Sequence, residues 1–289
     1  MSKIIYEIMH RENCVAQIST VGECKIYLED FMPYDLMLEE SNDFDKRIKN
    51  AMSFYSWCAS RMIPPDRTYA KEILNSIGAS QSVTDRERAQ IALSYHCLSL
   101  LDVFWVKEEN EKIRFEDINL FAHSLSNALV DIALRGHQMT VTNAHLLAND
   151  LSTGGLYPKA WVRKEDGFYL YKDGGRDAVE REVLASKICR CFDCHQVLYE
   201  QGMFENEPVS ISKIMTSQRY SLVTYAAYDV YCTNHDWNTL DKILELDAPS
   251  YYMMNILDYL VGNTDRHWEN WGLLVDNETN QPIRLHDLM

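Results

Sequence analysis

A short polar stretch near the C-terminus, Gly262 to Asn270, constrains the fold of this chain most strongly, because apolar sequence stands on both sides of it. Residues 256–261 are largely apolar, and residues 271–275 are typical of a short buried strand. The polar stretch is therefore predicted to be a loop held at both ends by the core. Asp265 and Asn270 lie five residues apart on it and can converge on one point, which suits a reaction that needs a base beside a metal ion.

Length and charge limit the classes of function. A chain of 289 residues with 46% apolar and 25% charged residues has an ordinary globular composition, and two lobes are expected at this length. The 43 acidic residues against 28 basic ones give a formal charge of −15, which argues against direct nucleic-acid binding because a polyanion would be repelled. Any bound nucleotide must therefore be held by a local cationic site.

The sequence shows no secretion signal at its start, and no apolar run approaches the roughly 18 residues of a membrane span. We therefore expect a cytoplasmic protein without a membrane partner. Its eight cysteines are then expected to be mostly small buried side chains. The group Cys189-x-Cys191-x-x-Cys194-His195 could suggest zinc, but its spacing fits no common zinc finger, and structural cysteines at a helix end are favoured.

Residues 1–148 are predicted to form a scaffold or recognition region of short strands followed by helices. Three apolar runs within residues 4–28 indicate antiparallel strands, and a helical period extends from about residue 43 to residue 137. Thr84 with Glu87 forms a capping-box signature, and the helical pattern continues from Phe115 to Ala133. We find no convergent set of nucleophiles or metal ligands here, so a scaffold, a recognition surface or a regulator is expected.

A second region, residues 149–289, begins with a glycine-bearing loop at 151–159 that is followed by a hairpin ending at Lys172. Gly154 and Gly155 could offer backbone N–H groups to phosphate, although two adjacent glycines more often form a simple turn. A helix over 177–188 carries Glu180 and Glu182, and either could form an ion pair that orients the lysine toward phosphates.

The remaining pattern supplies three more elements. Residues 209–214 alternate like a strand, and a helix is expected to run from Ser250 into the polar loop. The last apolar segment, residues 282–287, is typical of a short strand that ends in Asp287.

The order glycine-bearing loop, strand lysine, helix glutamate, Asp-x-x-x-x-Asn loop, strand and aspartate resembles that of protein-kinase-like folds. The block Gly-Asn-Thr-Asp-Arg-His-x-x-Asn at 262–270 resembles the HipA-like bacterial kinases, with looser similarity to phosphoinositide-kinase loops. The resemblance implies an α+β, protein-kinase-like two-lobed fold. Relatives continue past the last aspartate with a helical segment, so the C-terminal lobe is expected to be incomplete here.

The resemblance also implies roles for single residues. Asp265 would be the catalytic base or would orient the acceptor hydroxyl, and Asn270 and Asp287 would hold Mg²⁺. His267, in the same loop, is expected to be a packed residue and not a proton carrier.

On the nucleotide side, the resemblance implies that Lys172 contacts the α- and β-phosphates of ATP and pairs with Glu182, which matches the family pattern better than Glu180. Gly154, Gly155 and Lys159 would cover the phosphates, although the loop lacks the G-x-G-x-x-G pattern of conventional protein kinases.

The function expected from these residues is transfer of the ATP γ-phosphate to a Ser or Thr hydroxyl of a protein. Two alternatives remain open at this point: a nucleotide-binding interaction module that transfers no phosphate, and a lipid or small-molecule kinase. An antitoxin-like or regulatory protein partner is also possible for a chain of this kind.

Overall fold

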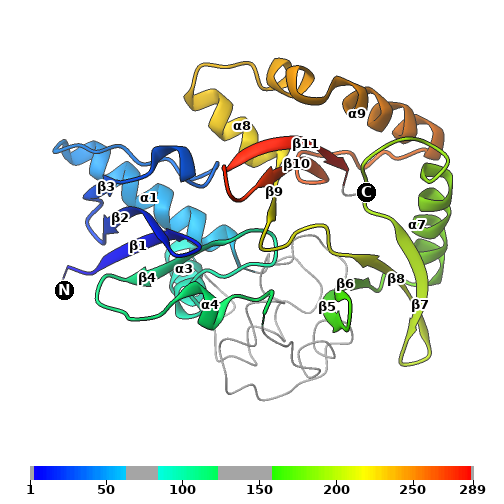
Figure 1. Ribbon diagram of the computed structural model, residues 1–289, viewed down its shortest axis with the longest axis horizontal. Coiled ribbons are helices and arrows are strands. Elements are labelled where there is room, and N and C mark those ends of the chain that lie inside the picture. The colour runs from blue at the N-terminus through cyan, green and yellow to red at the C-terminus, as the bar shows by residue number, and fades with distance from the viewer. Residues whose placement is uncertain (1–2, 63–83, 123–157, 288–289) are drawn as a thin grey trace. The chain divides into compact units, whose positions relative to one another are not determined.

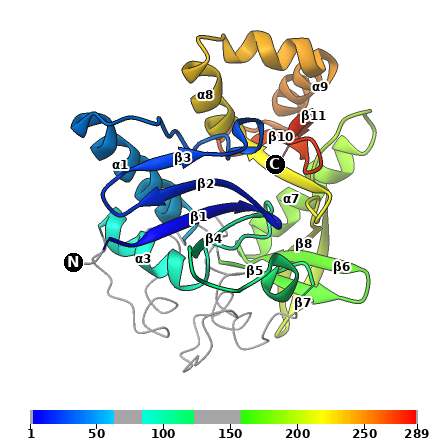
Figure 2. The same cartoon turned by 60° about the vertical axis from the view of Figure 1, so that its left-hand side comes forward.

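The N-terminal strands predicted from the sequence form one antiparallel sheet. In the computed structural model, which describes residues 3–62, 84–122 and 158–287, they are β1 (Ile5–His10), β2 (Asn13–Ser19) and β3 (Cys24–Ile26). A fourth strand, β4 (Phe104–Glu108), pairs with β1 and gives the order β3-β2-β1-β4 (Figure 2). The prediction of a helical region was therefore wrong for the residues of β4. A short apolar run of this kind has no period that distinguishes a strand from a buried helix.

The helices of this part are shorter than the pattern predicted. Those within residues 3–62 and 84–122 are the 3-10 helix η1 (Glu29–Phe31) and the α-helices α1 (Phe44–Ser60), α3 (Asp85–Ser94) and α4 (Phe115–Ile118). The capping box is confirmed: the Thr84 hydroxyl accepts a hydrogen bond from the backbone of Glu87, whose carboxylate accepts one from the backbone of Thr84.

Two predicted helices end early for local reasons. Helix α3 stops at Ser94 because His96 and Cys97 adopt positive φ angles of 59° and 53°, which turn the chain out of the helix. Helix α4 stops at Ile118, and the side chain of Asn119 donates to the carbonyl of Phe115 at 3.2 Å in place of a further helical turn. The prediction of helix to Ala133 is thus wrong for residues 119–122, and residues 123–133 lie outside the described residues.

A largely buried ion pair joins Arg61, just after helix α1, to Asp102, just before strand β4. The Arg61 guanidinium donates to both carboxylate oxygens of Asp102 at 2.9 and 2.7 Å and to the Cys97 carbonyl at 2.5 Å. The guanidinium lies 4.8 Å from the ring centre of Trp57, which is 3% exposed. The bidentate geometry satisfies most donors of a buried guanidinium, so its desolvation is offset.

Buried His10 is expected to make stability dependent on pH. It is 1% exposed between the rings of Phe31 and Phe104, and within the described residues its Nε2 atom has no hydrogen-bond partner. Burial, helped by the charge of Arg11, lowers the pKa of His10 from 6.5 to about 4. Between these two pH values His10 therefore binds a proton in the unfolded chain but not in the folded chain. The stability that is present above pH 6.5 is lost as the pH falls toward 4.

We expect the free energy of unfolding to fall by roughly 2 kcal/mol between pH 7 and pH 5 through His10 alone. His10→Leu, which cannot be protonated, should reduce that fall by the same amount in urea titrations at the two pH values. An unchanged pH slope in the variant would show that His10 does not titrate in this way.

The chain divides into two compact units, Met1–Trp161 and Val162–Met289. The predicted boundary at residues 148/149 lies outside the described residues and stays a prediction. The second unit contains two antiparallel sheets, of order β5-β6-β8-β7 and β11-β10-β9. Their strands are β5 (Lys159–Lys164), which begins in the first unit, β6 (Gly167–Lys172), β7 (Tyr199–Phe204), β8 (Glu207–Lys213), β9 (Tyr220–Thr224), β10 (Trp271–Asp276) and β11 (Gln281–Asp287).

Three helices cover these sheets. Helix α7 (Arg176–Cys189) packs on β7 and β8, whereas α8 (Tyr225–Asn234) packs on β9 and β10 and α9 (Thr239–Val261) packs on β11 (Figure 1). Helix α9 is kinked at Asp247, just before Pro249, so its second half begins close to the predicted start at Ser250. The predicted strands at 209–214, 271–275 and 282–287 and the predicted helix at 177–188 are confirmed to within about two residues at each end.

Within the described ranges, no helix is both long enough and apolar enough to span a membrane.

Candidate functional site

Lys172 stands at the end of β6 and points toward helix α7. Its Nζ atom donates to Glu182 Oε1 at 3.0 Å and to the Tyr199 hydroxyl at 2.6 Å. The Lys172 side chain is 20% exposed, and Glu180, the other candidate partner, is exposed to solvent. The structure thus brings together the lysine and glutamate that the sequence paired, and it selects Glu182 over Glu180.

Tyr199 and Ser210 complete this cluster and were missed in the sequence. The Ser210 hydroxyl donates to the second carboxylate oxygen of Glu182, and the Tyr199 backbone N–H donates to the Ser186 hydroxyl at 2.9 Å. Strand pairing aligns Lys172 with Ser210, which explains why the serine reaches the same carboxylate. The signal that could have located Ser210 is alternation: Ser210 and Ser212 stand two residues apart on one face of β8.

The cluster keeps Lys172 charged. Burial lowers the pKa of Lys172, but the nearby Tyr199 and Glu182 raise it more, so the net pKa is above its usual value. Burial also raises the pKa of Tyr199, which therefore acts as a neutral hydrogen-bonding group. A fixed cation of this kind, with a side chain still reachable from solvent, is suited to contact an anionic ligand.

The loop predicted to carry the chemistry follows α9. Gly262 adopts the left-handed conformation, with φ 68° and ψ 33°, and ends the helix there. Asn263 then donates to the Asp258 carboxylate at 2.8 Å and accepts from the Asp265 backbone N–H at 3.1 Å. These contacts fix the backbone of Asp265 and leave its side chain exposed.

Asn270 closes the loop on Asp265. Its side-chain amide donates to the Asp265 carbonyl, and its backbone N–H donates to the His267 carbonyl at 3.0 Å. The carboxamide oxygen of Asn270 makes no hydrogen bond among the described residues and can act as a ligand. His267 is exposed, so the prediction that it is packed was wrong: its Nδ1 accepts from the Glu269 backbone at 3.2 Å and its ring remains at the surface.

Arg266 links this loop to Asp287. Its guanidinium donates to the Asp258 carboxylate at 2.6 and 2.7 Å and to the Asp287 carboxylate at 2.8 and 3.1 Å. Burial lowers the pKa of Arg266, but its hydrogen bonds to Asp258 and Asp287 raise it more, so the guanidinium stays charged. No role for this arginine was predicted from the sequence.

The backbone of Asp287 joins the loop to the lysine cluster. Its N–H donates to the His195 carbonyl at 3.0 Å, and its carbonyl accepts from Val197 at 2.9 Å. Two residues further along, Tyr199 contacts Lys172. The segment 195–199 therefore connects Asp287 with Lys172 inside one unit, as a joint site requires.

The residues present fit a magnesium ion that shares its ligands with phosphate. No group of three or more His, Cys, Asp or Glu side chains suited to a metal occurs in the described part of the chain. Mg²⁺ needs only one or two protein carboxylates when substrate phosphates and waters complete its octahedron, and it prefers oxygen ligands. The Asp287 carboxylate and the carboxamide oxygen of Asn270 are a donor set of that kind.

Three predicted phosphate-binding residues are placed less completely. Gly154 and Gly155 lie outside the described residues, so their contacts stay a prediction. Lys159 is the first residue of β5 and falls in the first unit, and its role also stays a prediction.

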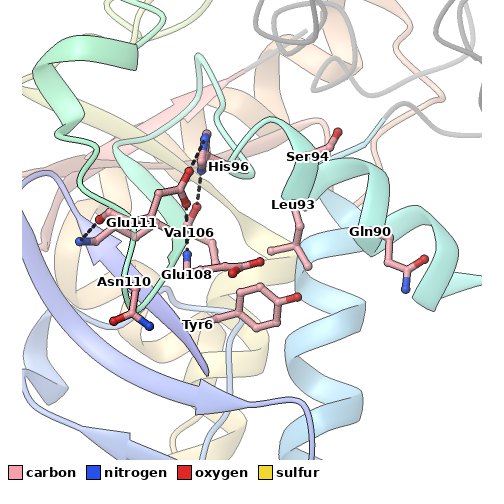
Figure 3. Close-up of a pocket in the computed structure, with 10 residues that line it drawn as sticks. Tyr6, Gln90, Leu93, Ser94, His96, Val106, Glu108, Asn110 and Glu111 are labelled. Atoms are coloured by element: carbon pink, nitrogen blue, oxygen red, sulfur yellow. Dashed lines mark hydrogen bonds and ion pairs between the residues drawn. The ribbon is translucent and has the colours of Figure 1, made fainter. Parts of the chain in front are cut away.

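The first unit contains a cavity of about 670 Å³ that includes none of these residues (Figure 3). Tyr6, Leu93, His96 and Glu108 line it, together with Glu111, whose carboxylate lies 3.7 Å from His96 Nε2. The other ring nitrogen of His96 is 3.0 Å from the Val106 carbonyl. The cavity is therefore a polar feature separate from the candidate site.

Solved structures that are similar to this chain include HipA and CtkA. One is HipA, in a structure of the Shewanella oneidensis MR-1 toxin–antitoxin system HipA, HipB and its operator DNA, with a TM-score of 0.60 and 12% identity over 98% of this chain and 76% of that chain. The other is the Helicobacter pylori proinflammatory kinase CtkA, with a TM-score of 0.35 and 21% identity; the match covers 44% of this chain and about half, 53%, of that one. No protein-family model matches the chain, and no curated protein matches it by sequence.

The fold prediction is confirmed: the chain has a HipA-like, protein-kinase-like α+β fold, because almost its whole length superposes on Shewanella HipA. At 12% identity this likeness shows the fold alone. The roles of Asp265, Lys172, Glu182, Asn270 and Asp287 therefore rest on the local geometry and stay predictions.

Proposed function

We propose that this chain is a cytoplasmic bacterial kinase that transfers the γ-phosphate of ATP to a Ser or Thr hydroxyl of a protein in the presence of Mg²⁺. The observation that carries the proposal is a largely buried lysine, held charged by Glu182 and Tyr199, in the same unit as the Asp265–Asn270 loop. Phosphoryl transfer demands positioning and charge neutralisation more than covalent chemistry, and such fixed groups supply both.

On the nucleotide side, Lys172 would bind the α- and β-phosphate oxygens. Glu182 orients its ammonium group, and Ser210 holds the other oxygen of Glu182, so the lysine has little rotational freedom to lose on binding. Gly154, Gly155 and Lys159 would add contacts to the phosphates in this proposal.

On the acceptor side, Asp265 would accept a hydrogen bond, and then the proton, from the attacking hydroxyl. Its exposed side chain is open to a protein substrate, whereas its backbone is fixed by Asn263 and Asn270. Asn270 and Asp287 would hold Mg²⁺, which when bound neutralises charge on the phosphates.

We also propose a regulatory protein partner. The structure of Shewanella HipA includes HipB and operator DNA. In a similar assembly of this chain, the partner protein would hold the nucleic acid. The formal charge of −15 on this chain disfavours direct contact with DNA, so a partner would have to supply the basic surface.

The test is incubation of the full chain with γ-labelled ATP, with Mg²⁺ or with a chelator, followed by separation of protein, lipid and small-molecule products. Labelled Ser or Thr in protein, dependent on Mg²⁺, is expected. Stabilisation by nucleotide without any labelled product would favour an interaction module, and label in an inositol lipid or a metabolite alone would favour the other kinase class.

A further inference from the structure

The Arg266 guanidinium uses all five of its N–H groups inside the second unit. Its Nε and Nη2 atoms donate to Asp258, Nη1 and Nη2 donate to Asp287, and Nη1 also donates to the Asn270 carbonyl at 3.0 Å. Because an arginine has five such donors, the guanidinium has no unused hydrogen-bonding group. Arg266 therefore contacts both residues that were assigned to the metal.

This cluster is shielded from solvent. The side chains of Arg266, Asp258 and Asp287 are 18%, 13% and 3% exposed. Two carboxylates and one guanidinium carry a net charge of −1, and attraction or repulsion between such groups is much stronger here than at an open surface. A divalent cation that approaches Asp287 must therefore share carboxylate oxygens with a fixed positive charge.

We propose that Arg266 is an internal counter-ion that keeps Asp287 from binding a divalent cation until phosphate oxygens are present. Phosphate adds negative charge and oxygen ligands, and these offset the repulsion between the cation and the guanidinium. Arg266 is thus a positioning residue, which acts through Asp287. The link to phosphate rests on the proposed kinase function; the counter-ion effect at Asp287 does not.

A purely structural role for Arg266 makes a different prediction. If the arginine only held β11 against α9, replacing it would weaken the fold and would weaken or not affect cation binding. If it is a counter-ion, a neutral replacement leaves two shielded carboxylates facing one another, and a divalent cation should bind them better. The direction of the change in affinity separates the two roles.

The experiment is a titration of the full chain with Mn²⁺ alone, in which free Mn²⁺ is followed by electron paramagnetic resonance. Arg266→Met and Arg266→Gln are expected to bind Mn²⁺ at least about tenfold more tightly than wild type. Asp287→Asn in either background should abolish the gain. Arg266→Lys keeps the charge and should stay close to wild type.

Arg219→Met is the matched control. Arg219 also bridges two acids, Asp276 and Glu278, but it is 44% exposed and Glu278 is 58% exposed. Its loss changes the net charge equally and should give no tight site, because exposed charges are screened. Two neutral variants of Arg266 keep the test usable if one of them does not fold. Tight Mn²⁺ binding by wild type that is lost in Asp287→Asn would also overturn the proposal.

Equal Mn²⁺ affinity in wild type and the folded neutral variants would refute the counter-ion role. If the gain in Mn²⁺ affinity survives Asp287→Asn, the cation does not bind at Asp287 and that assignment is refuted. If Arg219→Met shows the same gain, the gain is a general effect of net charge. Phosphate transfer is scored separately: label transfer without the gain refutes this inference alone, and the gain without label transfer refutes the kinase function alone.

Discussion

Replacing Asp265 with alanine is expected to lower the rate of label transfer by about 10²- to 10⁴-fold, the range that general-base catalysis contributes. The carboxylate is exposed, and none of the described hydrogen bonds uses it, because Asn263 and Asn270 hold only the backbone of Asp265. The variant should therefore keep its fold, with a change in stability within about 0.5 kcal/mol, as is usual for a surface substitution. Initial rates with γ-labelled ATP, together with a thermal unfolding curve, measure the two effects.

Glu269→Ala is the matched control for this prediction. Glu269 is an exposed acid four residues further along the same loop, and only its backbone N–H makes a described hydrogen bond. It should lose little activity, because it is not part of the predicted site. Equal rates for Asp265→Ala and wild type would exclude Asp265 as the catalytic base.

Elements formed by local patterns could be predicted from the sequence. Helix α7 was found from the period of its apolar residues, α3 from its capping box, and β10 and β11 from short apolar runs between turn residues. In each of these cases neighbours in sequence determine the structure, so a short window of residues contains the information.

Elements formed by distant partners were missed or misassigned. Strand β4 pairs with β1, whose residues lie almost one hundred positions earlier, and its own run of five residues gives no clear period. Strand β7 was not predicted for the same reason: its pairing with β8 and the contact of Tyr199 with Lys172 appear only in the folded chain.

The candidate site divides in the same way. The types and order of Lys172, Glu182, Asp265, Asn270 and Asp287 could be read from the sequence, because chemistry restricts which side chains can serve. The role of Arg266 could not, since Asp258 and Asp287 lie 8 residues before it and 21 after it and meet only on the guanidinium. Ion pairs formed across such separations depend on the register of β11 with β10, which no local pattern specifies.

Replacing Lys172 with methionine is expected to abolish the thermal stabilisation that Mg²⁺ and a non-hydrolysable ATP analogue give to wild type. Label transfer should fall at least about 10²-fold, because positioned cations on phosphates supply much of the catalysis of phosphoryl transfer. Methionine keeps most of the side-chain volume, so packing against α7 is largely retained. The variant should be less stable even without nucleotide, since Glu182 then keeps only its hydrogen bond from Ser210.

Lys213→Met separates the specific effect of Lys172 from a loss of charge. Lys213 ends the neighbouring strand β8, pairs with Asp166 at 2.8 Å and lies 5.7 Å from the ring centre of Tyr169. Lys172 has the same kind of surroundings, because it pairs with Glu182 and lies 4.2 Å from the ring centre of Tyr199. The difference is exposure: the Lys213 side chain is 53% exposed and that of Lys172 is 20% exposed. Only the shielded lysine is oriented strongly enough to attract phosphate, so Lys213→Met should respond to nucleotide like wild type. If Lys172→Met also responds like wild type, the nucleotide is bound elsewhere in the chain and the cluster of Lys172, Glu182 and Tyr199 is structural.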